Sequence, residues 1–214
     1  MPLYALTEHL WFPPVHEALE DGLLAIGGDL RAERLIKAYS NGIFPWYEDG
    51  IPLWWSPDPR FVLFPDELKV SKSMKTLMKK GVFQYRYNTA FPAVLDQCRY
   101  IKRKDQEGTW INDEMSDAYR HLHGLGYAVS AETFINDELA GGLYGLRMGR
   151  LFFGESMFSR HPNASKFAFI SLIDQLKKEG VVLIDCQVYT PHLESLGARM
   201  IAREEFLDFL KEYL

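Results

Sequence analysis

Two tryptophans and two prolines within eight residues restrict the fold of this chain more than any other feature. They lie in the segment Leu53–Arg60, with the sequence LWWSPDPR. Adjacent side chains of an extended strand point to opposite faces, so one sheet surface cannot bury both tryptophans. The prolines exclude helix and remove two backbone donors from any sheet. The segment therefore either binds an aromatic and anionic partner, such as bases on a phosphate backbone, or fills a seam between two subdomains.

Length and composition allow one large domain, or a small domain joined to a medium one. The chain has 214 residues, of which 47% are hydrophobic, enough for a packed core. No run approaches the ~20 apolar residues that a membrane span needs, and we see no export signal at the start. Cys98 and Cys186 lie far apart and form no CxxC pair, so we expect reduced thiols, a cytoplasmic location and no zinc site.

Positive charge is concentrated in one segment, although the chain as a whole has a net charge of −5. Residues 69–104 contain ten Lys or Arg and one acid, which leaves +9 there and −14 on the remainder. Such a local concentration provides an electrostatic footprint for a polyanion. A solvated basic helix face would have the same composition. The segment is therefore a candidate contact for nucleic acid.

The pattern of apolar and turn residues predicts an α+β fold with a mixed sheet. Residues 1–65, rich in Pro, Gly and Trp, are expected to form a small N-terminal domain with one helix at 31–40. The remainder, 66–214, is expected to contain an antiparallel meander with strands at 127–134, 138–147 and 151–158. Around the meander the sequence predicts a buried strand and five helices: the strand at 181–185, and helices at 71–80, 89–101, 112–123, 164–179 and 204–214.

Polar residues follow four apolar ones at the end of the expected strand 181–185. Side chains alternate along a strand, so Asp185 and Gln187 should share one face and Cys186 should lie on the other. A carboxylate beside an amide fixes the direction of the amide carbonyl, which suits a reaction that aims an amine at a carbonyl. Polar residues are also a common way of ending a strand. We expect Cys186 to act as a small hydrophobe and not as a nucleophile.

A second group of candidate residues lies in the segment 151–158, where large apolar side chains flank one acid, Glu155. Phe152 and Met157, together with Ile184, could line a pocket for a bulky apolar group, although plain core packing gives the same pattern. Glu155 needs a partner within such a strand, and a cationic acceptor or an internal Arg would serve. The six histidines show no metal-binding arrangement, so we expect no metal.

Several motifs, taken in order, resemble those of a known family. They are GLLAIGGDL (22–30), YSNGIFPW (39–46), WWSPDPR (54–60), GESMFSR (154–160), NASK (163–166) and LIDCQ (183–187). Together they closely resemble the bacterial leucyl/phenylalanyl-tRNA–protein transferases over almost the whole chain.

The resemblance implies an enzyme that takes Leu or Phe, with Met as a further candidate, from aminoacyl-tRNA. It implies that the residue is attached to the N-terminal Lys or Arg of an acceptor protein and marks that protein for degradation through the N-end rule. It also implies an acetyltransferase-like (GNAT) catalytic domain beside a small N-terminal domain. We expect a cytoplasmic monomer with no cofactor and no membrane contact.

The same likeness assigns Asp185 and Gln187 as the catalytic pair. The aminoacyl-adenosine at the 3′ end of the tRNA is expected to contact a substrate-binding set: Trp46, Trp54, Trp110, Phe152, Glu155, Met157 and Ile184. Within the basic segment, the candidates for contact with the tRNA body are Lys79, Lys80, Arg99 and Lys102.

The chemistry of the residues agrees with this reaction. An α-amino group has a pKa of about 7.7–8.0, so a strong base is unnecessary and positioning contributes most. An apolar pocket distinguishes one methylene by only ~1–3 kcal/mol, which fits acceptance of both Leu and Phe. The loop 160–165 contains Pro162 and no Gly, where coenzyme-A acyltransferases hold a pyrophosphate. A coenzyme-A-dependent N-acyltransferase and a non-catalytic tRNA-binding module remain the alternatives, and Asp185 could act as base or as orienter.

Overall fold

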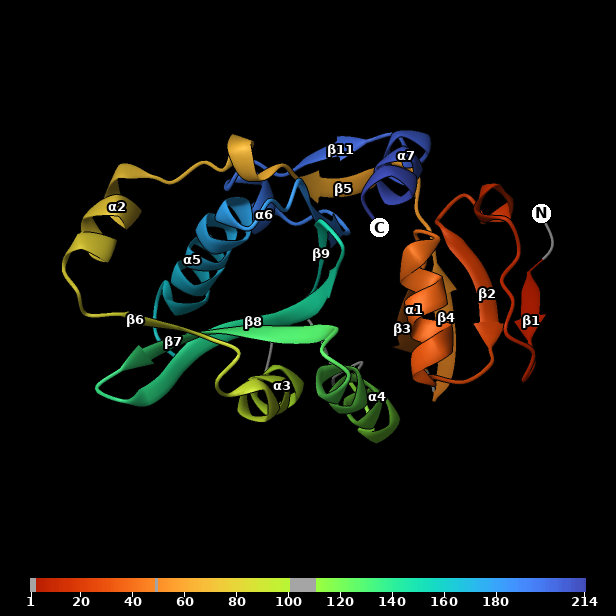
Figure 1. The fold of residues 1–214 in the computed structure, drawn as a ribbon, viewed down its shortest axis with the longest axis horizontal. Coiled ribbons are helices and arrows are strands. Elements are labelled where there is room, and N and C mark those ends of the chain that lie inside the picture. The colour runs from red at the N-terminus through yellow and green to blue at the C-terminus, as the bar shows by residue number, and fades with distance from the viewer. Residues whose placement is uncertain (1–2, 49, 101–110) are drawn as a thin grey trace.

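Two β-sheets lie side by side in the structure, a computed structural model that describes residues 3–48, 50–100 and 111–214 (Figure 1). The smaller sheet has the strand order β1-β2-β4-β3, and the larger has the order β11-β5-β10-β9-β8-β7-β6. The strands of the smaller sheet are β1 (Tyr4–Leu6), β2 (Leu23–Gly27), β3 (Phe44–Glu48) and β4 (Ile51–Trp55). Those of the larger are β5 (Arg60–Leu63), β6 (Gln84–Tyr87), β7 (Ala128–Ile135), β8 (Glu138–Met148), β9 (Leu151–Ser159), β10 (Leu183–Gln187) and β11 (Arg199–Ile201).

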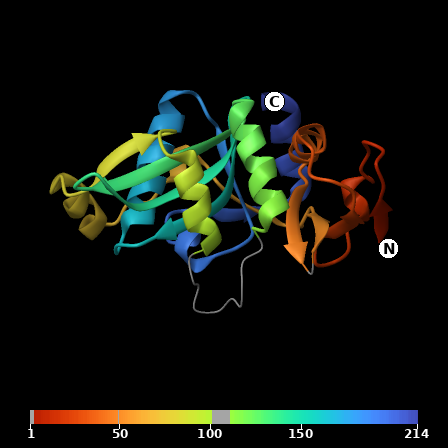
Figure 2. The same ribbon diagram turned by 90° about the horizontal axis from the view of Figure 1, so that it is seen from below.

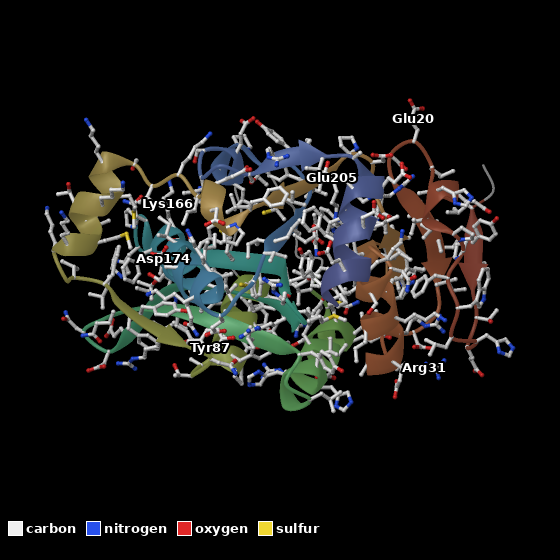
Figure 3. The ribbon with its side chains drawn as sticks, turned by 45° about the horizontal axis from the view of Figure 1, so that its top comes forward. Glu20, Arg31, Tyr87, Lys166, Asp174 and Glu205 are labelled. Atoms are coloured by element: carbon white, nitrogen blue, oxygen red, sulfur yellow. The ribbon has the colours of Figure 1, made fainter. Side chains whose placement is uncertain are left out.

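Helices cover both faces of the larger sheet. The α-helices of the described chain are α1 (Ala32–Ser40), which lies against β3 of the smaller sheet, and α2 (Lys72–Lys79), α3 (Phe91–Tyr100), α4 (Asp113–Gly124), α5 (Ala164–Lys178), α6 (Pro191–Glu194) and α7 (Arg203–Tyr213). Figures 1 and 2 show α5 on one face of the sheet and α3 and α4 on the other. Figure 3 shows Asp174 of α5 and Glu205 of α7 on the outer sides of their helices, whereas the apolar residues of α5, and Phe206 and Leu210 of α7, are buried. No helix of the described ranges has the length and apolar character for crossing a membrane.

The predicted α+β plan with a mixed sheet is confirmed. Strands β7, β8 and β9 form the expected antiparallel meander, and β10 pairs parallel with β9 and antiparallel with β5. The predicted helices are present to within two residues at each described end, although Ile101 lies outside the described residues. Strand β10 begins two residues later than predicted, because the two preceding N–H groups have other partners. The N–H of Val181 donates to the carbonyl of Leu176 at the end of α5, and the N–H of Val182 donates to the carbonyl of Arg150.

Strand β5 connects the two parts of the chain. It begins at Arg60, immediately after the proline-rich segment, and its residue Val62 pairs with Asp185 of β10 and Arg199 of β11. The N-terminal domain at 1–65 stays a prediction, and β5 lies within that range while pairing in the larger sheet. The chain thus crosses from one sheet to the other at Arg60.

Trp54 packs in the core of the smaller sheet. Its side chain is 0% exposed, its Nε1 donates to the carbonyl of Gly27 over 2.8 Å, and its ring meets that of Phe12 edge-on. The adjacent Trp55 is half-buried, as alternation requires. Trp54 therefore exposes no surface in this structure, and its predicted contact with substrate stays a prediction.

Gly145 allows β8 and β9 to pack at their irregularity, where the register shifts between Tyr144 and Gly145. A Cβ at Gly145 would lie 2.1 Å from the carbonyl oxygen of Phe153 and 2.6 Å from the ring of Phe152. Neither neighbour can move without disturbing the strands that carry the site described below.

We predict that Gly145→Ala destabilises the protein by more than about 2 kcal/mol, because the added methyl overpacks the sheet. Gly124→Ala is the matched control, since a Cβ there meets nothing within 4 Å and its φ is not positive; it should be neutral or slightly stabilising. Urea unfolding measures both. Equal stabilities of the two variants would contradict the packing described for β8 and β9.

Candidate active site

A cavity of about 680 Å³ opens beside the middle of β9 and the end of β10, where the smaller sheet approaches the larger. Apolar groups form much of its wall, and the polar groups gather at Glu155, Asp185 and Gln187. The lining residues come from β3, β8, β9, α5, β10, α6 and the segment between β10 and α6: Pro45, Trp46, Leu143, Tyr144, Gly154, Glu155, Ser156, Met157, Phe169, Ile184, Asp185, Cys186, Gln187, Val188, Thr190, His192 and Leu193. The predicted catalytic pair therefore reaches a cavity of a size typical of ligand sites.

A buried ion pair joins Arg60 to Asp185. Nε of Arg60 donates to Oδ1 over 2.8 Å and Nη2 donates to Oδ2 over 2.6 Å, so the pair is bidentate. The side chains are 1% and 0% exposed. The Arg60 guanidinium lies 4.7 Å from the ring centroids of both Phe44 and Phe206 and donates to the carbonyl of Gly42. The interpretation that the cation of this segment binds a phosphate backbone is thus wrong, because its anionic partner is internal.

The backbone of Gln187 is turned out of the strand. Its φ is +64°, and the register between β10 and β5 shifts between Asp185 and Gln187. The left-handed region is costly for a residue with a side chain, and here the Gln187 N–H donates to Oδ1 of Asp185 over 2.9 Å. The expected contact between the two side chains is therefore wrong. Asp185 holds the Gln187 backbone and not its amide group.

Glu155 holds the amide instead. Nε2 of Gln187 donates to Oε1 of Glu155 over 2.8 Å. This leaves the amide oxygen of Gln187 without a hydrogen bond in the described part of the chain, at a residue that lines the cavity. A carbonyl oxygen held in this way can accept a hydrogen bond from an incoming amine.

Two tyrosines complete the surroundings of Glu155. The hydroxyl oxygen of Tyr39, on α1, lies 2.8 Å from Oε1, and that of Tyr119, on α4, lies 2.6 Å from Oε2. Burial, with a smaller contribution from the charge of Asp185, raises the pKa of Glu155 to about 7. The predicted internal Arg is wrong for the described residues, since hydroxyl and amide groups provide the contacts, and the predicted contact with a cationic acceptor stays a prediction.

The structure brings together most of the predicted substrate-binding set. Trp46, Glu155, Met157 and Ile184 line the cavity, and Trp46 is 37% exposed. Phe152 is not among the lining residues, since its ring packs over Gly145 in the core, and its contact with the amino-acid pocket stays a prediction. Trp110 lies outside the described residues.

The predicted tRNA-binding residues are spread over two helices. Lys79 ends α2 and Lys80 follows it, both exposed, whereas Arg99 lies on α3 and pairs with Asp113 over 2.6 Å. Figure 1 shows α2 at the far end of the larger sheet, whereas α3 lies below the sheet. Lys102 lies outside the described residues. The basic segment therefore does not form a single helix face.

Cys186 and His192 are further titratable side chains of the cavity, and the sequence led to an expectation for Cys186 only. Cys186 is 9% exposed, and burial raises the pKa of its thiol, which agrees with the expectation of an inert thiol. His192 was missed: it lines the cavity, and burial lowers its pKa, which favours neutral imidazole. Tyr39 and Tyr119 were also missed. The described residues contain no group of three or more His, Cys, Asp or Glu that could hold a metal.

Comparisons with known proteins agree with the motifs. The family model for leucyl/phenylalanyl-tRNA protein transferase matches residues 62–211, and the model for the N-terminal domain of that protein matches residues 28–58. The leucyl/phenylalanyl-tRNA–protein transferase of Flavobacterium johnsoniae is 56% identical over 98% of this chain and 99% of its own. That of Pseudomonas putida is 57% identical over 100% and 96%, and that of Syntrophobacter fumaroxidans is 54% identical over 99% and 91%.

Solved structures show weaker likenesses. L-PGS from Bacillus licheniformis matches 80% of this chain and 57% of its own, with a TM-score of 0.44 and 13% identity. A GCN5-related N-acetyltransferase from Kribbella flavida matches 83% and 64%, with a TM-score of 0.41 and 9% identity. Both scores lie below 0.5, so these likenesses carry no argument about function.

We predict that Arg60→Met lowers the free energy of unfolding by about 3–5 kcal/mol, because it leaves the charge of Asp185 buried without its partner. The double variant Arg60→Met/Asp185→Leu should recover most of this loss, since no uncompensated charge remains. Urea unfolding measures both.

Arg199→Met is the matched control. Arg199 pairs with Glu67 over 2.9 Å, but both side chains are nearly half exposed. Its loss should cost no more than about 1 kcal/mol. Equal losses of unfolding free energy for the two single variants would show that the buried Arg60 pair contributes no more to stability than the exposed Arg199 pair.

Proposed function

This chain belongs to the leucyl/phenylalanyl-tRNA protein transferase family, and we propose that it moves Leu or Phe, and also Met, from aminoacyl-tRNA to the N-terminal Lys or Arg of acceptor proteins. The product is then marked for degradation through the N-end rule. We further propose that it acts as a cytoplasmic monomer. The observation that carries the proposed chemistry is the amide of Gln187, held by Glu155 with its oxygen at the cavity.

The apolar side of the cavity would hold the side chain of the transferred residue. Met157, Phe169, Ile184 and Leu193 supply this side. Methionine adapts its shape to neighbours of different size, and an apolar pocket distinguishes similar side chains by only a few kcal/mol. Such a wall is compatible with branched and aromatic donors alike.

The reaction replaces an ester by an amide. The acceptor nitrogen forms a bond to the carbonyl carbon of the donor, the bond from that carbon to the ribose oxygen breaks, and the proton lost by the amine is taken up by the leaving oxygen. The amine is partly neutral near pH 7, since its pKa is about 7.7–8.0. Gln187 would accept a hydrogen bond from this amine and direct its lone pair to the carbonyl carbon.

Asp185 would act as an orienter and not as a base. Both of its oxygens are occupied by Arg60, and Oδ1 also accepts from the Gln187 N–H. The carboxylate is 0% exposed and its charge is balanced by the guanidinium. Its part in the reaction is to hold the unusual backbone of Gln187.

A coenzyme-A-dependent acyl transfer is the second candidate function. The backbone contacts at the start of α5 disfavour it. A pyrophosphate cradle needs free backbone donors at a helix N-terminus. Here Pro162 has none, the N–H of Ala164 donates to His161, and the N–H of Ser165 donates to Ser159 Oγ. Two of the donors that a pyrophosphate would use, the N–H groups of Ala164 and Ser165, are engaged within the protein.

We predict that the protein adds one residue to a radiolabelled peptide that begins with Arg when Phe-tRNA is supplied. Gln187→Ala should reduce this transfer by about 100-fold or more, because the amine loses its acceptor, while tRNA affinity stays unchanged. Gln84→Ala, at an exposed position of β6, is the control and should transfer normally. Normal transfer by Gln187→Ala would refute the assigned role, and acetyl transfer from acetyl-coenzyme A would favour the second candidate.

We also predict that charge reversal at Lys79, Lys80, Arg99 and Lys102 weakens binding of whole tRNA and flattens its salt dependence. Transfer from phenylalanyl-adenosine, a donor without the tRNA body, should be unaffected. Lys211→Glu on α7 is the control. Equal loss with both donors would mean that these residues serve folding and not contact with the tRNA body.

A further inference from the structure

Four oxygens beside Gln187, two from tyrosines and two from Glu155, form a closed ring of three short contacts. Tyr39 Oη lies 2.8 Å from Glu155 Oε1, Tyr119 Oη lies 2.6 Å from Glu155 Oε2, and the two hydroxyls lie 2.6 Å from each other. Each distance is that of a hydrogen bond. A hydrogen bond needs a proton between its two oxygens, so the ring requires three protons.

The two tyrosines supply only two of these protons. With an ionised Glu155, either the contact between the hydroxyls or one contact to the carboxylate is left as two oxygens facing each other without a proton. Ionising a tyrosine would widen the deficit, and burial raises the pKa of both tyrosines well above the usual value. The third proton must therefore come from the carboxyl group.

We infer that Glu155 is a neutral carboxylic acid in the resting protein, closed into a ring with Tyr39 and Tyr119, and that it serves as a positioning residue for Gln187. In this ring Oε2–H of Glu155 donates to Tyr119, Tyr119 donates to Tyr39, and Tyr39 donates to Oε1. Oε1 also accepts from Nε2 of Gln187. Every polar atom of the ring then has a partner, and bonds that run in one direction strengthen each other.

A second buried glutamate, Glu132, shows that the number of protons a carboxyl group needs depends on its hydrogen-bond partners and not on burial alone. Glu132 is 0% exposed and accepts from the hydroxyls of Ser130 and Thr89 and from the backbone N–H groups of Thr89 and Ala90. These four contacts bring four protons. An ionised carboxylate satisfies all of them, so Glu132 needs no proton of its own.

The charges around Glu155 favour the neutral form. Tyr39 faces it from α1 and Tyr119 from α4, and neither brings a cation. Asp185 faces it from β10 and raises its pKa, and the cation nearest to Asp185, Arg60, is bound to Asp185 itself. Burial acts in the same direction.

The proton on Glu155 gives the site an upper pH limit. When it is lost, one short contact of the ring has no proton, the ring opens, and the acceptor of the Gln187 amide moves. The effect on transfer rests on the function proposed above, whereas the neutral acid itself does not. The two parts therefore need separate measurements.

Infrared spectroscopy tests the neutral acid without any reaction. The carbonyl band of a protonated carboxylic acid should be present at about pH 6, disappear with a midpoint of about pH 7, and be missing in Glu155→Gln. Glu132→Gln should leave the band unchanged. A spectrum without such a band, or a band unaffected by Glu155→Gln, would overturn the inference whether or not the protein transfers amino acids.

The pH dependence of transfer tests the positioning role. Gln at position 155 copies the neutral acid, because its amide donates to Tyr119 and its oxygen accepts from Tyr39 and Gln187. The acceptor amine titrates equally in both proteins, so the ratio of the rate of Glu155→Gln to that of the wild type isolates Glu155. We expect a ratio near one at about pH 6 that rises about tenfold by about pH 8. A ratio far below one at every pH, in a variant that unfolds at the wild-type temperature, would show that the ionised carboxylate is required.

Discussion

The buried pair between Arg60 and Asp185 is the interaction on which the site depends. Removing two charges from water is costly, and attraction offsets this cost only where the geometry is good and the remaining polar atoms have partners. Here the pair is bidentate, and Arg60 also lies close to two aromatic rings. Those rings belong to β3 and α7, and a further bond reaches the carbonyl of Gly42 after α1. A single guanidinium thus connects the smaller sheet, the larger sheet and the C-terminal helix.

The geometry of Gln187 follows from this connection. Asp185 can accept from the Gln187 N–H because Arg60 holds its carboxylate in place, and that bond supports a backbone conformation that L-residues rarely adopt. Glu155 then fixes the side chain, and tyrosines from α1 and α4 fix Glu155. The groups that face the substrate are therefore oriented by partners from four other elements. This explains why so small a set of polar atoms can be placed accurately in an apolar cavity.

Local patterns in the sequence predict much of the fold. The meander of β7, β8 and β9 and the long helices follow from periodicity and from Gly, Ser and Asn at their ends. The short strands β5 and β11 do not, because neither has enough residues to show a period, and both form by pairing with distant segments. Asp185 and Gln187 could be chosen from their place after a buried strand. Their geometry could not, since the register shift at Gln187 breaks the alternation on which that reasoning relied.

The other differences between the predicted and the observed site arise because the interacting residues lie far apart in the chain. Arg60 and Asp185 are separated by 125 residues and Tyr39 and Glu155 by 116, and no local pattern links them. The charge of Arg60 suggested an external anion because its internal one was not visible in the sequence.

The side-chain amide of Gln187 provides the most direct test of this account. Its signals in a nitrogen-15 NMR spectrum can be assigned by their loss in Gln187→Ala. We expect one pair of amide protons that exchange slowly with water in the wild type, and their broadening or displacement in Arg60→Met under conditions where that variant stays folded. An unchanged Gln187 amide in folded Arg60→Met protein would contradict it.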